Sequence, residues 1–236
     1  MTISAIILAG GLGTRLRNTV PDLPKPMAPI NGRPFLEYLL DYWITQGVEN
    51  FVISVGYRHQ QIVSHFGNRY KKANLQYAIE DTPLGTGGGL CLAITKLPVL
   101  EPFLLLNGDT YFRVDLNKLM RFAAINNSDW CFSLFRTNEQ GRYMGISMSS
   151  NGKISSLKAG VDDANRLVNG GVYWVDPRRL DCKLPKLAQV SLEDDIFAAA
   201  LASNQVLMGL ESSGIFIDIG VPVDYQRAGE LITLFE

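Results

Sequence analysis

Near the start of the chain, glycines and two cations are spaced in a way that suits phosphate binding. Residues 7–27 read ILAGGLGTRLRNTVPDLPKPM, in which three glycines, then Arg15 and Lys25, follow an apolar run. Backbone N–H groups at the end of a strand bind phosphate oxygens, and the guanidinium fork of Arg15 can contact two phosphates. Lys25 stands between prolines, whose fixed φ angles restrain its backbone. A tight turn would explain the glycines alone, but the added cations favour a polyphosphate site.

A second glycine-rich segment and two aspartates extend this prediction. Residues 80–89 read EDTPLGTGGG, which lets a flat ring lie against bare backbone, although a flexible surface turn is the other explanation. Asp109 closes the apolar segment 103–109 (FLLLNGD), and Asp218 closes the apolar run within 214–220 (GIFIDIG). An Asn-Gly-Asp sequence is also typical of a structural turn. Two carboxylates at strand ends in one sheet, beside a polyphosphate, suit Mg²⁺.

Other familiar chemistries are disfavoured by the same residues. The dinucleotide-binding fingerprint requires Gly or Ala where Leu16 stands, and the Gly-Lys-Ser/Thr sequence of a P-loop is missing. His59 and His65 have no nearby cysteine and no HExxH motif, so we expect no zinc site there. No Ser-His-Asp or Cys-His pattern predicts a protein nucleophile.

The composition of the 236-residue chain restricts its partners and its compartment. Lys plus Arg (22) nearly balance Asp plus Glu (23), which gives no general attraction to nucleic acid or to an anionic membrane. The cysteines at 91, 131 and 182 are odd in number and form no CxxC pair, so we expect neither a disulfide framework nor a thiolate zinc site. No apolar run approaches the ~18–20 residues that span a bilayer. We therefore expect a soluble protein of the reducing cytoplasm.

Strand and helix patterns alternate through the first half of the chain. Apolar runs predict strands at 4–9, 50–56, 75–79 and 103–109, and helical spacing predicts helices at 34–47, 87–97 and 116–126. This alternation indicates a mostly parallel sheet with helices on both faces. After Asp129 come short strands, with helical stretches only at 192–202 and near the C-terminus. We expect this half to complete the sheet and to add an antiparallel flap over the pocket.

The opening motif resembles that of the sugar-1-phosphate nucleotidylyltransferases, which read GGxGTRL followed about ten residues later by PKP. Further matches cover nearly the whole chain: LGTGGG at 84–89, NGD at 107–109, NGGVY at 169–173, SLEDD at 191–195 and FIDIGVPVDY at 216–225. The resemblance implies one domain, 1–236, with a nucleotide-binding half of about 1–128 and a sugar-binding half of about 129–236. It implies a Rossmann-like α/β fold of the nucleotide-diphospho-sugar transferase type, with a small antiparallel sugar-side flap.

The resemblance also implies a reaction, in which an oxygen of a sugar 1-phosphate attacks the α-phosphorus of a nucleoside triphosphate and pyrophosphate leaves. It assigns catalysis to Arg15, Lys25 and Asp109, and a Mg²⁺ ion to Asp109 and Asp218. The implied nucleotide-binding residues are Leu8, Ala9, Gly10, Gly11, Gly13, Thr14, Arg15, Glu80, Gly85, Thr86 and Asn107. The implied sugar-binding residues are Gly108, Tyr143, Gly145, Lys158, Asn169, Gly170 and Glu193. Leu157 departs from the Glu that often precedes the lysine, which leaves open one hydroxyl contact.

Within the family, the segments LPKPMAPINGRPFLEYLLDY, PLGTGGG and FIDIGVPVDY are most similar to the D-glycero-α-D-manno-heptose 1-phosphate guanylyltransferases. The substrates implied are GTP and that heptose 1-phosphate, and a homodimer is plausible. Alternatives are a mannose-1-phosphate guanylyltransferase, a uridylyl- or thymidylyltransferase for another hexose 1-phosphate, or a non-catalytic nucleotide-sugar-binding protein. A glycosyltransferase is disfavoured because its usual Asp-x-Asp motif would need an aspartate where Tyr111 stands.

Overall fold

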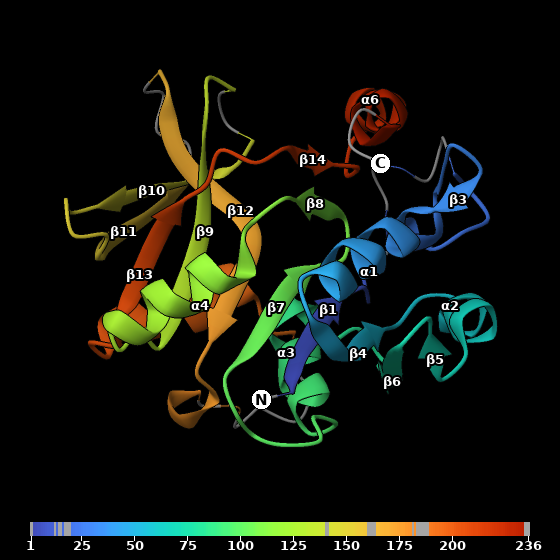
Figure 1. The fold of residues 1–236 in the computed structure, drawn as a ribbon, viewed down its shortest axis with the longest axis horizontal. Helices are drawn as coiled ribbons and strands as arrows, with labels where there is room; N and C mark the ends of the chain where they lie inside the picture. Colours follow the sequence, from blue (N-terminus) through green and yellow to red (C-terminus); the bar gives the residue numbers. More distant parts are fainter. Residues whose placement is uncertain are drawn as a thin grey trace.

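A mixed β-sheet forms the centre of the molecule (Figure 1). The computed structural model describes residues 2–11, 13, 16, 20–139, 142–159, 164–180, 182 and 189–233, and within these ranges the sheet has ten strands. Eight follow the order β11-β10-β12-β7-β1-β4-β6-β5, while β9 pairs with β12 and with β13. The strands are β1 (Ile3–Leu8), β4 (Val48–Val55), β5 (Arg69–Tyr70), β6 (Ala73–Ile79), β7 (Phe103–Asn107), β9 (Trp130–Thr137), β10 (Met144–Met148), β11 (Ile154–Ala159), β12 (Arg166–Val175) and β13 (Leu207–Glu211).

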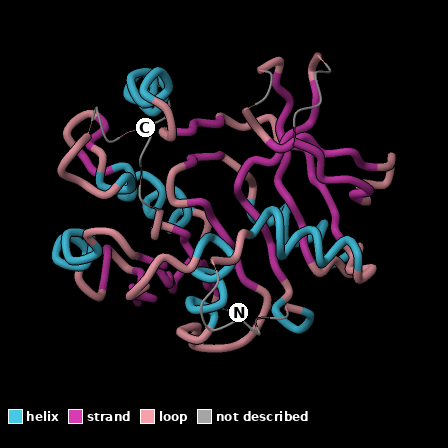
Figure 2. Tube along the Cα trace, turned by 180° about the vertical axis from the view of Figure 1, so that it is seen from behind, coloured by secondary structure: helices cyan, strands magenta, loops and turns pink. Residues whose placement is uncertain are grey.

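The direction of the strands divides the sheet into two parts. β7, β1, β4 and β6 run parallel to one another, whereas β12 joins β7 antiparallel. β12 then pairs antiparallel with β9 and β10, and β10 with β11. Ends of these antiparallel strands extend beyond the helices, as both views show (Figures 1 and 2). The predicted fold class, a mostly parallel sheet with a smaller antiparallel part, is confirmed.

Helices cover both faces of the sheet, as the alternation in the sequence predicts. One buried cluster contains residues of α1 (Phe35–Thr45), α2 (His59–Phe66), α4 (Leu116–Ile125) and α6 (Pro222–Thr233). The other contains residues of α3 (Gly85–Ile94), the π-helical turn η3 (Leu192–Phe197) and α5 (Ala198–Ala202). Ala5 and Ile7 of β1 belong to the first cluster and Ile6 to the second, since successive side chains of a strand point to opposite faces. Short 3₁₀ turns are η1 (Lys25–Met27) and η2 (Pro177–Arg179).

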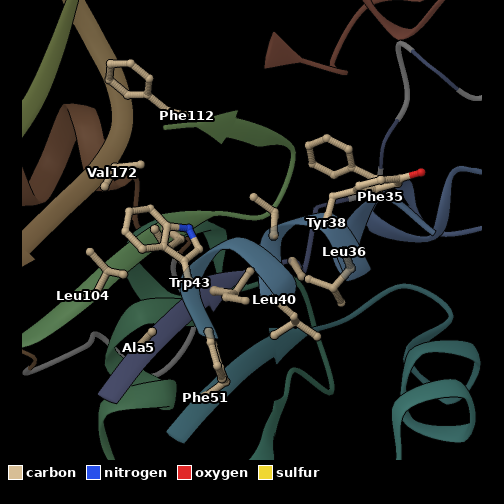
Figure 3. Close-up of a cluster of buried hydrophobic side chains, with 14 of the residues drawn as sticks. Ala5, Phe35, Leu36, Tyr38, Leu40, Trp43, Phe51, Leu104, Phe112 and Val172 are labelled. Carbon is tan, nitrogen blue, oxygen red and sulfur yellow. The ribbon is translucent and has the colours of Figure 1, made fainter. Parts of the chain in front are cut away.

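The helix α1 anchors the parallel strands from one face. Figure 3 shows its Leu40 and Trp43 beside the strands that carry Ala5, Phe51 and Leu104. Trp43 is fully buried, and burying a large apolar side chain contributes roughly 1.5–3 kcal/mol. This packing fixes the strands whose carboxyl ends carry the predicted site.

Two features of the fold differ from the sequence analysis. The helix α2 was missed because few of its residues are apolar, and only Ile62 and Phe66 are buried. Asp218 was expected at the end of a strand in the main sheet, and this was wrong. β14 (Phe216–Asp218) instead pairs with β8 (Thr110–Phe112) in a separate two-stranded sheet, with Asp218 opposite Thr110. A second small sheet joins β2 (Pro29–Ile30) to β3 (Arg33–Pro34).

The cysteines also correct a prediction. Cys91 of α3 and Cys182 form a disulfide, with their Cα atoms 5.3 Å apart, although no disulfide was expected. Their separation of 91 residues gives no sequence signal, because folding alone brings the two segments together. Cys131 is free and buried, and burial raises the pKa of its thiol to about 12. In the part of the chain that the structure describes, no helix is long and apolar enough to cross a membrane.

Candidate active site

A cavity of about 590 Å³ opens where the parallel strands end. Leu8 ends β1, Asn107 ends β7, and Glu80 directly follows β6. Ligands of open α/β sheets bind at this edge, because the connecting loops leave backbone groups free there. The predicted site residues that line the cavity are Leu8, Ala9, Gly10, Gly11, Gly13, Lys25, Glu80, Gly85, Thr86, Asn107, Gly108, Asp109 and Glu193. Ser54, Gly89 and Gln189 also line it and were not named from the sequence.

Other groups approach two glycines of this cavity closely. A Cβ atom on Gly10 would lie 2.2 Å from Oε1 of Glu80, and one on Gly108 would lie 2.6 Å from the carbonyl oxygen of Leu8. The N–H of Gly108 donates to that carbonyl at 2.9 Å. A Cβ on Gly11 would meet no atom within 4 Å. The glycine loop therefore packs tightly on one side and presents open space on the other.

Glu80 projects its carboxylate into the cavity between β4 and the start of α3. Its Oε1 accepts a hydrogen bond from the hydroxyl of Ser54 at 2.9 Å, and its Oε2 accepts one from the N–H of Leu84 at 3.0 Å. Each oxygen keeps a further lone pair, because a carboxylate offers about four acceptor sites. Glu80 is thus held in one orientation while it can still accept hydrogen bonds from a ligand.

Lys25 and Asp109, which also line the cavity, form a direct ion pair. The Nζ of Lys25 lies 2.5 Å from Oδ2 of Asp109, and their side chains are 16% and 37% exposed. The carbonyl of Asp109 accepts a hydrogen bond from the N–H of Ile219 at 3.0 Å, which brings the end of β14 to this point. The structure therefore brings the segment that carries Asp218 next to Asp109, although the two aspartates are 109 positions apart in the sequence.

Asp218 lies deeper than Asp109 and in a less favourable environment for charge. Burial raises its pKa above the usual value, and repulsion from Asp109 adds to the shift. A hydrogen bond from the N–H of Gly220 at 2.6 Å, with Lys25 and Arg142, opposes this rise.

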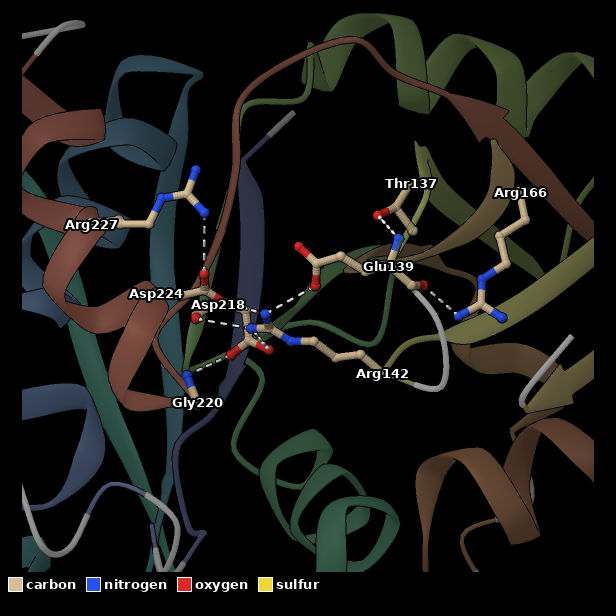
Figure 4. Close-up of polar contacts among 8 residues, drawn as sticks. All are labelled: Thr137, Glu139, Arg142, Arg166, Asp218, Gly220, Asp224 and Arg227. Carbon is tan, nitrogen blue, oxygen red and sulfur yellow. Dashed lines mark hydrogen bonds and ion pairs between the residues drawn. The ribbon is translucent and has the colours of Figure 1, made fainter. Parts of the chain in front are cut away.

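Arg142 brings a third segment to the site, from the connection between β9 and β10 (Figure 4). Its guanidinium donates to Asp218 at 3.2 Å and to Glu139 at 3.1 Å, and it pairs with Asp224 of α6. The neighbouring Tyr143 was predicted from the sequence, whereas Arg142 was not. The only sequence signal was a cation in the RYMG segment, because Asp218 and Asp224, its partners at the site, lie more than 70 residues away.

Asp109 and Asp218 have the donor chemistry that suits Mg²⁺. Both are carboxylates, and Mg²⁺ is usually bound by one or two carboxylates, with phosphate oxygens and water completing its octahedron. Among the described residues, no group of three or more His, Cys, Asp or Glu could hold a metal ion without other ligands. The pair therefore fits a metal ion that is shared with a phosphate ligand.

Comparison with known proteins identifies the family. The sequence model described as "Nucleotidyl transferase" matches residues 4–233, which is nearly the whole chain. This chain belongs to the nucleotidyl transferase family. The predicted enzyme class, a sugar-1-phosphate nucleotidylyltransferase, is thereby confirmed.

Individual relatives of this nucleotidyl transferase match over almost their full lengths. D-glycero-alpha-D-manno-heptose 1-phosphate guanylyltransferase from Aneurinibacillus thermoaerophilus is 38% identical over 226 residues, covering 96% of each chain. The protein of the same name from Campylobacter jejuni is 35% identical, covering 94% of this chain and 97% of its own. The solved structure of HddC from Yersinia pseudotuberculosis complexed with GMP-PN has a TM-score of 0.84 and 29% identity, covering 98% of this chain and 99% of that one.

The predicted sugar residues of the nucleotidyl transferase are only partly gathered around the main cavity. Asn169 donates from Nδ2 to the hydroxyl of the buried Tyr173 at 2.6 Å. A Cβ on Gly170 would lie 2.5 Å from the ring of Phe112. Neither Asn169 nor Gly170 lines the main cavity, although β12 adjoins β7 beside it.

Glu193, a predicted sugar-binding residue, contacts Thr86, a predicted nucleotide-binding residue. The Thr86 hydroxyl accepts a hydrogen bond from the N–H of Leu192 at 2.8 Å and donates to Oε2 of Glu193 at 3.3 Å. η3 begins after Ser191, whose hydroxyl accepts from the N–H of Asp194. This cap fixes the turn that carries Glu193.

Other predicted residues lie away from the main cavity or outside the described residues. Tyr143 packs its ring against Phe135 and Phe216, with centroids 5.5 and 5.4 Å apart, and lines a separate cavity of about 420 Å³ together with Asp218. The backbone of Gly145 pairs with that of Lys158 across β10 and β11. Thr14, Arg15 and the side chain of Lys158 lie outside the described residues.

Proposed function

We propose that this nucleotidyl transferase transfers GMP from GTP to D-glycero-α-D-manno-heptose 1-phosphate, giving GDP-heptose and pyrophosphate. Two guanylyltransferases of that name are similar over almost the whole chain, and the HddC structure was solved with GMP-PN. The observation that carries the choice of base is the Glu80 carboxylate in the nucleotide cavity.

A carboxylate at this position favours guanine over the pyrimidine bases for a chemical reason. Ionised Glu80 only accepts hydrogen bonds, and guanine presents adjacent donors, N1–H and N2–H₂, along one edge. Uracil and thymine present a single N–H between two carbonyl oxygens, which a carboxylate repels. Because Ser54 and Leu84 fix the carboxylate, guanine can bind without reordering it.

The reaction would depend on positioning and charge neutralisation, since both reactants are anions. Lys25 is suited to bridge the α-phosphate and the attacking sugar phosphate, because its ammonium lies beside Asp109 in the cavity wall. The glycine loop would hold the triphosphate through its backbone N–H groups. We assign Arg15 to the leaving pyrophosphate on the strength of its motif. Mg²⁺ held by Asp109 and Asp218 would supply Lewis-acid stabilisation of charge at the α-phosphate.

A pyrophosphate-release panel tests this proposal. It crosses ATP, GTP, CTP, UTP and dTTP with heptose, mannose, glucose and N-acetylhexosamine 1-phosphates. The highest kcat/KM is expected for GTP with the manno-configured heptose. A preference for UTP or dTTP would contradict the choice of base. If no combination of nucleotide and sugar phosphate released pyrophosphate, the result would favour a non-catalytic sugar-nucleotide-binding protein.

Substitution of Glu80 tests the observation that carries the base. Glu80→Gln should lower the ratio of kcat/KM for GTP over UTP by about tenfold or more, because the amide turns one acceptor into a donor. Asp81→Asn is the matched control, since Asp81 is the neighbouring carboxylate and is exposed. Equal ratios for both variants and the parent would remove Glu80 from base selection.

A further inference from the structure

The guanidinium of Arg142 lies among three carboxylates that come from different segments (Figure 4). Glu139 follows β9, Asp218 ends β14 and Asp224 lies in α6. The side chains of Arg142, Asp218 and Asp224 are only 21%, 18% and 17% exposed, so solvent screens these charges weakly. Arg142 is therefore a desolvated cation in direct contact with one of the two carboxylates that fit a metal ion.

Asp109, the other carboxylate that fits the metal ion, is also in direct contact with a cation. Lys25 contacts Asp109 at 2.5 Å, and Arg142 contacts Asp218 at 3.2 Å. The charges of these two pairs cancel, while Glu139 and Asp224 add negative charge on the other side of Arg142. The two cations lie directly against Asp109 and Asp218 and repel a divalent ion that approaches these two carboxylates. A triphosphate in the main cavity changes this balance, because it brings several negative charges beside Lys25 and Asp109, which line that cavity.

We propose that Arg142 is the internal counter-ion of Asp218 and that, with Lys25, it keeps the metal site weak until a nucleotide is bound. The proposal rests on the metal role proposed above for Asp109 and Asp218. The metal ion then enters as part of the nucleotide complex rather than before it. Arg142 acts through Asp218 and is a positioning residue for the site.

The geometry also predicts whether replacement of Arg142 raises or lowers the affinity of the site for a metal ion. Asp218 keeps a second restraint, the hydrogen bond from the N–H of Gly220 at 2.6 Å, and its backbone pairs with β8. Its carboxylate therefore stays oriented without the guanidinium. Loss of the Arg142 cation should accordingly strengthen metal binding in the absence of nucleotide. If Arg142 only held Asp218 in place, its removal would instead weaken metal binding.

Mn²⁺ binding tests this directly in the full-length protein. Water proton relaxation enhancement distinguishes protein-bound Mn²⁺ from the Mn²⁺–nucleotide complex, and it is measured with and without GTP in the absence of sugar phosphate. We expect the parent protein to bind Mn²⁺ weakly without GTP and about tenfold or more tightly with it. Arg142→Gln should bind Mn²⁺ without GTP about tenfold more tightly than the parent.

Two further variants separate the contact with Asp218 from general charge effects. Arg142→Lys keeps the cation and should stay within about threefold of the parent. Arg227→Gln removes a cation that approaches Asp224 only at 3.8 Å, and it should change Mn²⁺ affinity by less than about twofold.

Three results would overturn the proposal. The first is equally tight Mn²⁺ binding by the parent with and without GTP, a comparison that needs no variant to fold. The second is equal or weaker binding by Arg142→Gln when its circular dichroism and thermal midpoint match those of the parent. The third is no Mn²⁺ binding under either condition, which would also remove the proposed metal role of Asp109 and Asp218 while leaving the choice of base to the substrate panel.

Discussion

Gly85 offers a quantitative test of the contact between the glycine-rich segment 80–89 and the segment that leads to Glu193. Its φ of +77° lies in the left-handed region, and a Cβ there would lie 2.4 Å from the carbonyl oxygen of Val190. That carbonyl accepts a hydrogen bond from the N–H of Gly87, and the N–H of Val190 donates to Leu84, both at 2.8 Å. Alanine at position 85 must therefore move Val190 and weaken both hydrogen bonds.

The expected magnitude of Gly85→Ala follows from these two costs. The left-handed conformation costs alanine about 1–2 kcal/mol. Two weakened hydrogen bonds add about 1 kcal/mol each, so the free energy of unfolding should fall by about 3–4 kcal/mol. Gly32→Ala is the matched control, because Gly32 has a φ of +81° but no atom within 4 Å of its Cβ position. It should cost only the conformational part.

Urea unfolding of the two variants measures the difference, which should be about 2 kcal/mol. The displaced segment carries Glu193, so the KM for the sugar 1-phosphate should also rise by roughly fivefold or more in Gly85→Ala and not in Gly32→Ala. Equal losses of stability in the two variants, with equal KM values, would refute the packing of Val190 against this loop.

Three other predictions concern catalysis and the cysteines. Asp109→Asn and Asp218→Asn should each lower kcat by roughly 10²–10⁴-fold. The double variant should lose far less than the product of the two single losses, because both carboxylates would act through one ion. A double variant whose loss in kcat by steady-state kinetics equals that product would contradict this. Arg15→Lys should lower kcat by ~10²-fold or more, since a point charge replaces a two-phosphate fork, and an unchanged kcat would remove Arg15 from catalysis. Without reductant, iodoacetamide at about pH 8 should leave the native chain unlabelled by mass spectrometry, because burial raises the pKa of the Cys131 thiol to about 12 and the other two cysteines form the disulfide; rapid labelling would contradict this.

The sequence predicts the parallel part of the fold well, and it predicts which residues the structure gathers at one cavity, for a physical reason. Buried parallel strands are continuous apolar runs, and their carboxyl ends meet at one edge. Glu80, Lys25 and Asp109 follow such runs or lie in the glycine and proline loops between them, and the structure brings them to one cavity. Residue types alone did not indicate the base, because the proposed selection of guanine depends on how Ser54 and Leu84 hold the Glu80 carboxylate.

The features that the sequence did not predict depend on contacts between distant segments. The disulfide joins residues 91 positions apart, and Arg142 meets Asp218 across 76 positions. The pairing of β8 with β14 was missed because both strands are only three residues long. Short strands and single cations carry no periodic signal, so their partners are set by the packing of the finished fold.

The shared hydrogen bonds of Thr86 have a consequence for the energetics of substrate binding. Its hydroxyl contacts Leu192 and Glu193 while Thr86 itself lies in the first turn of α3, beside the nucleotide cavity. Any displacement of α3 when a nucleotide binds therefore changes the position of Glu193. Equilibrium linkage is reciprocal, so the factor by which nucleotide changes the affinity for sugar phosphate must equal the factor by which sugar phosphate changes the affinity for nucleotide.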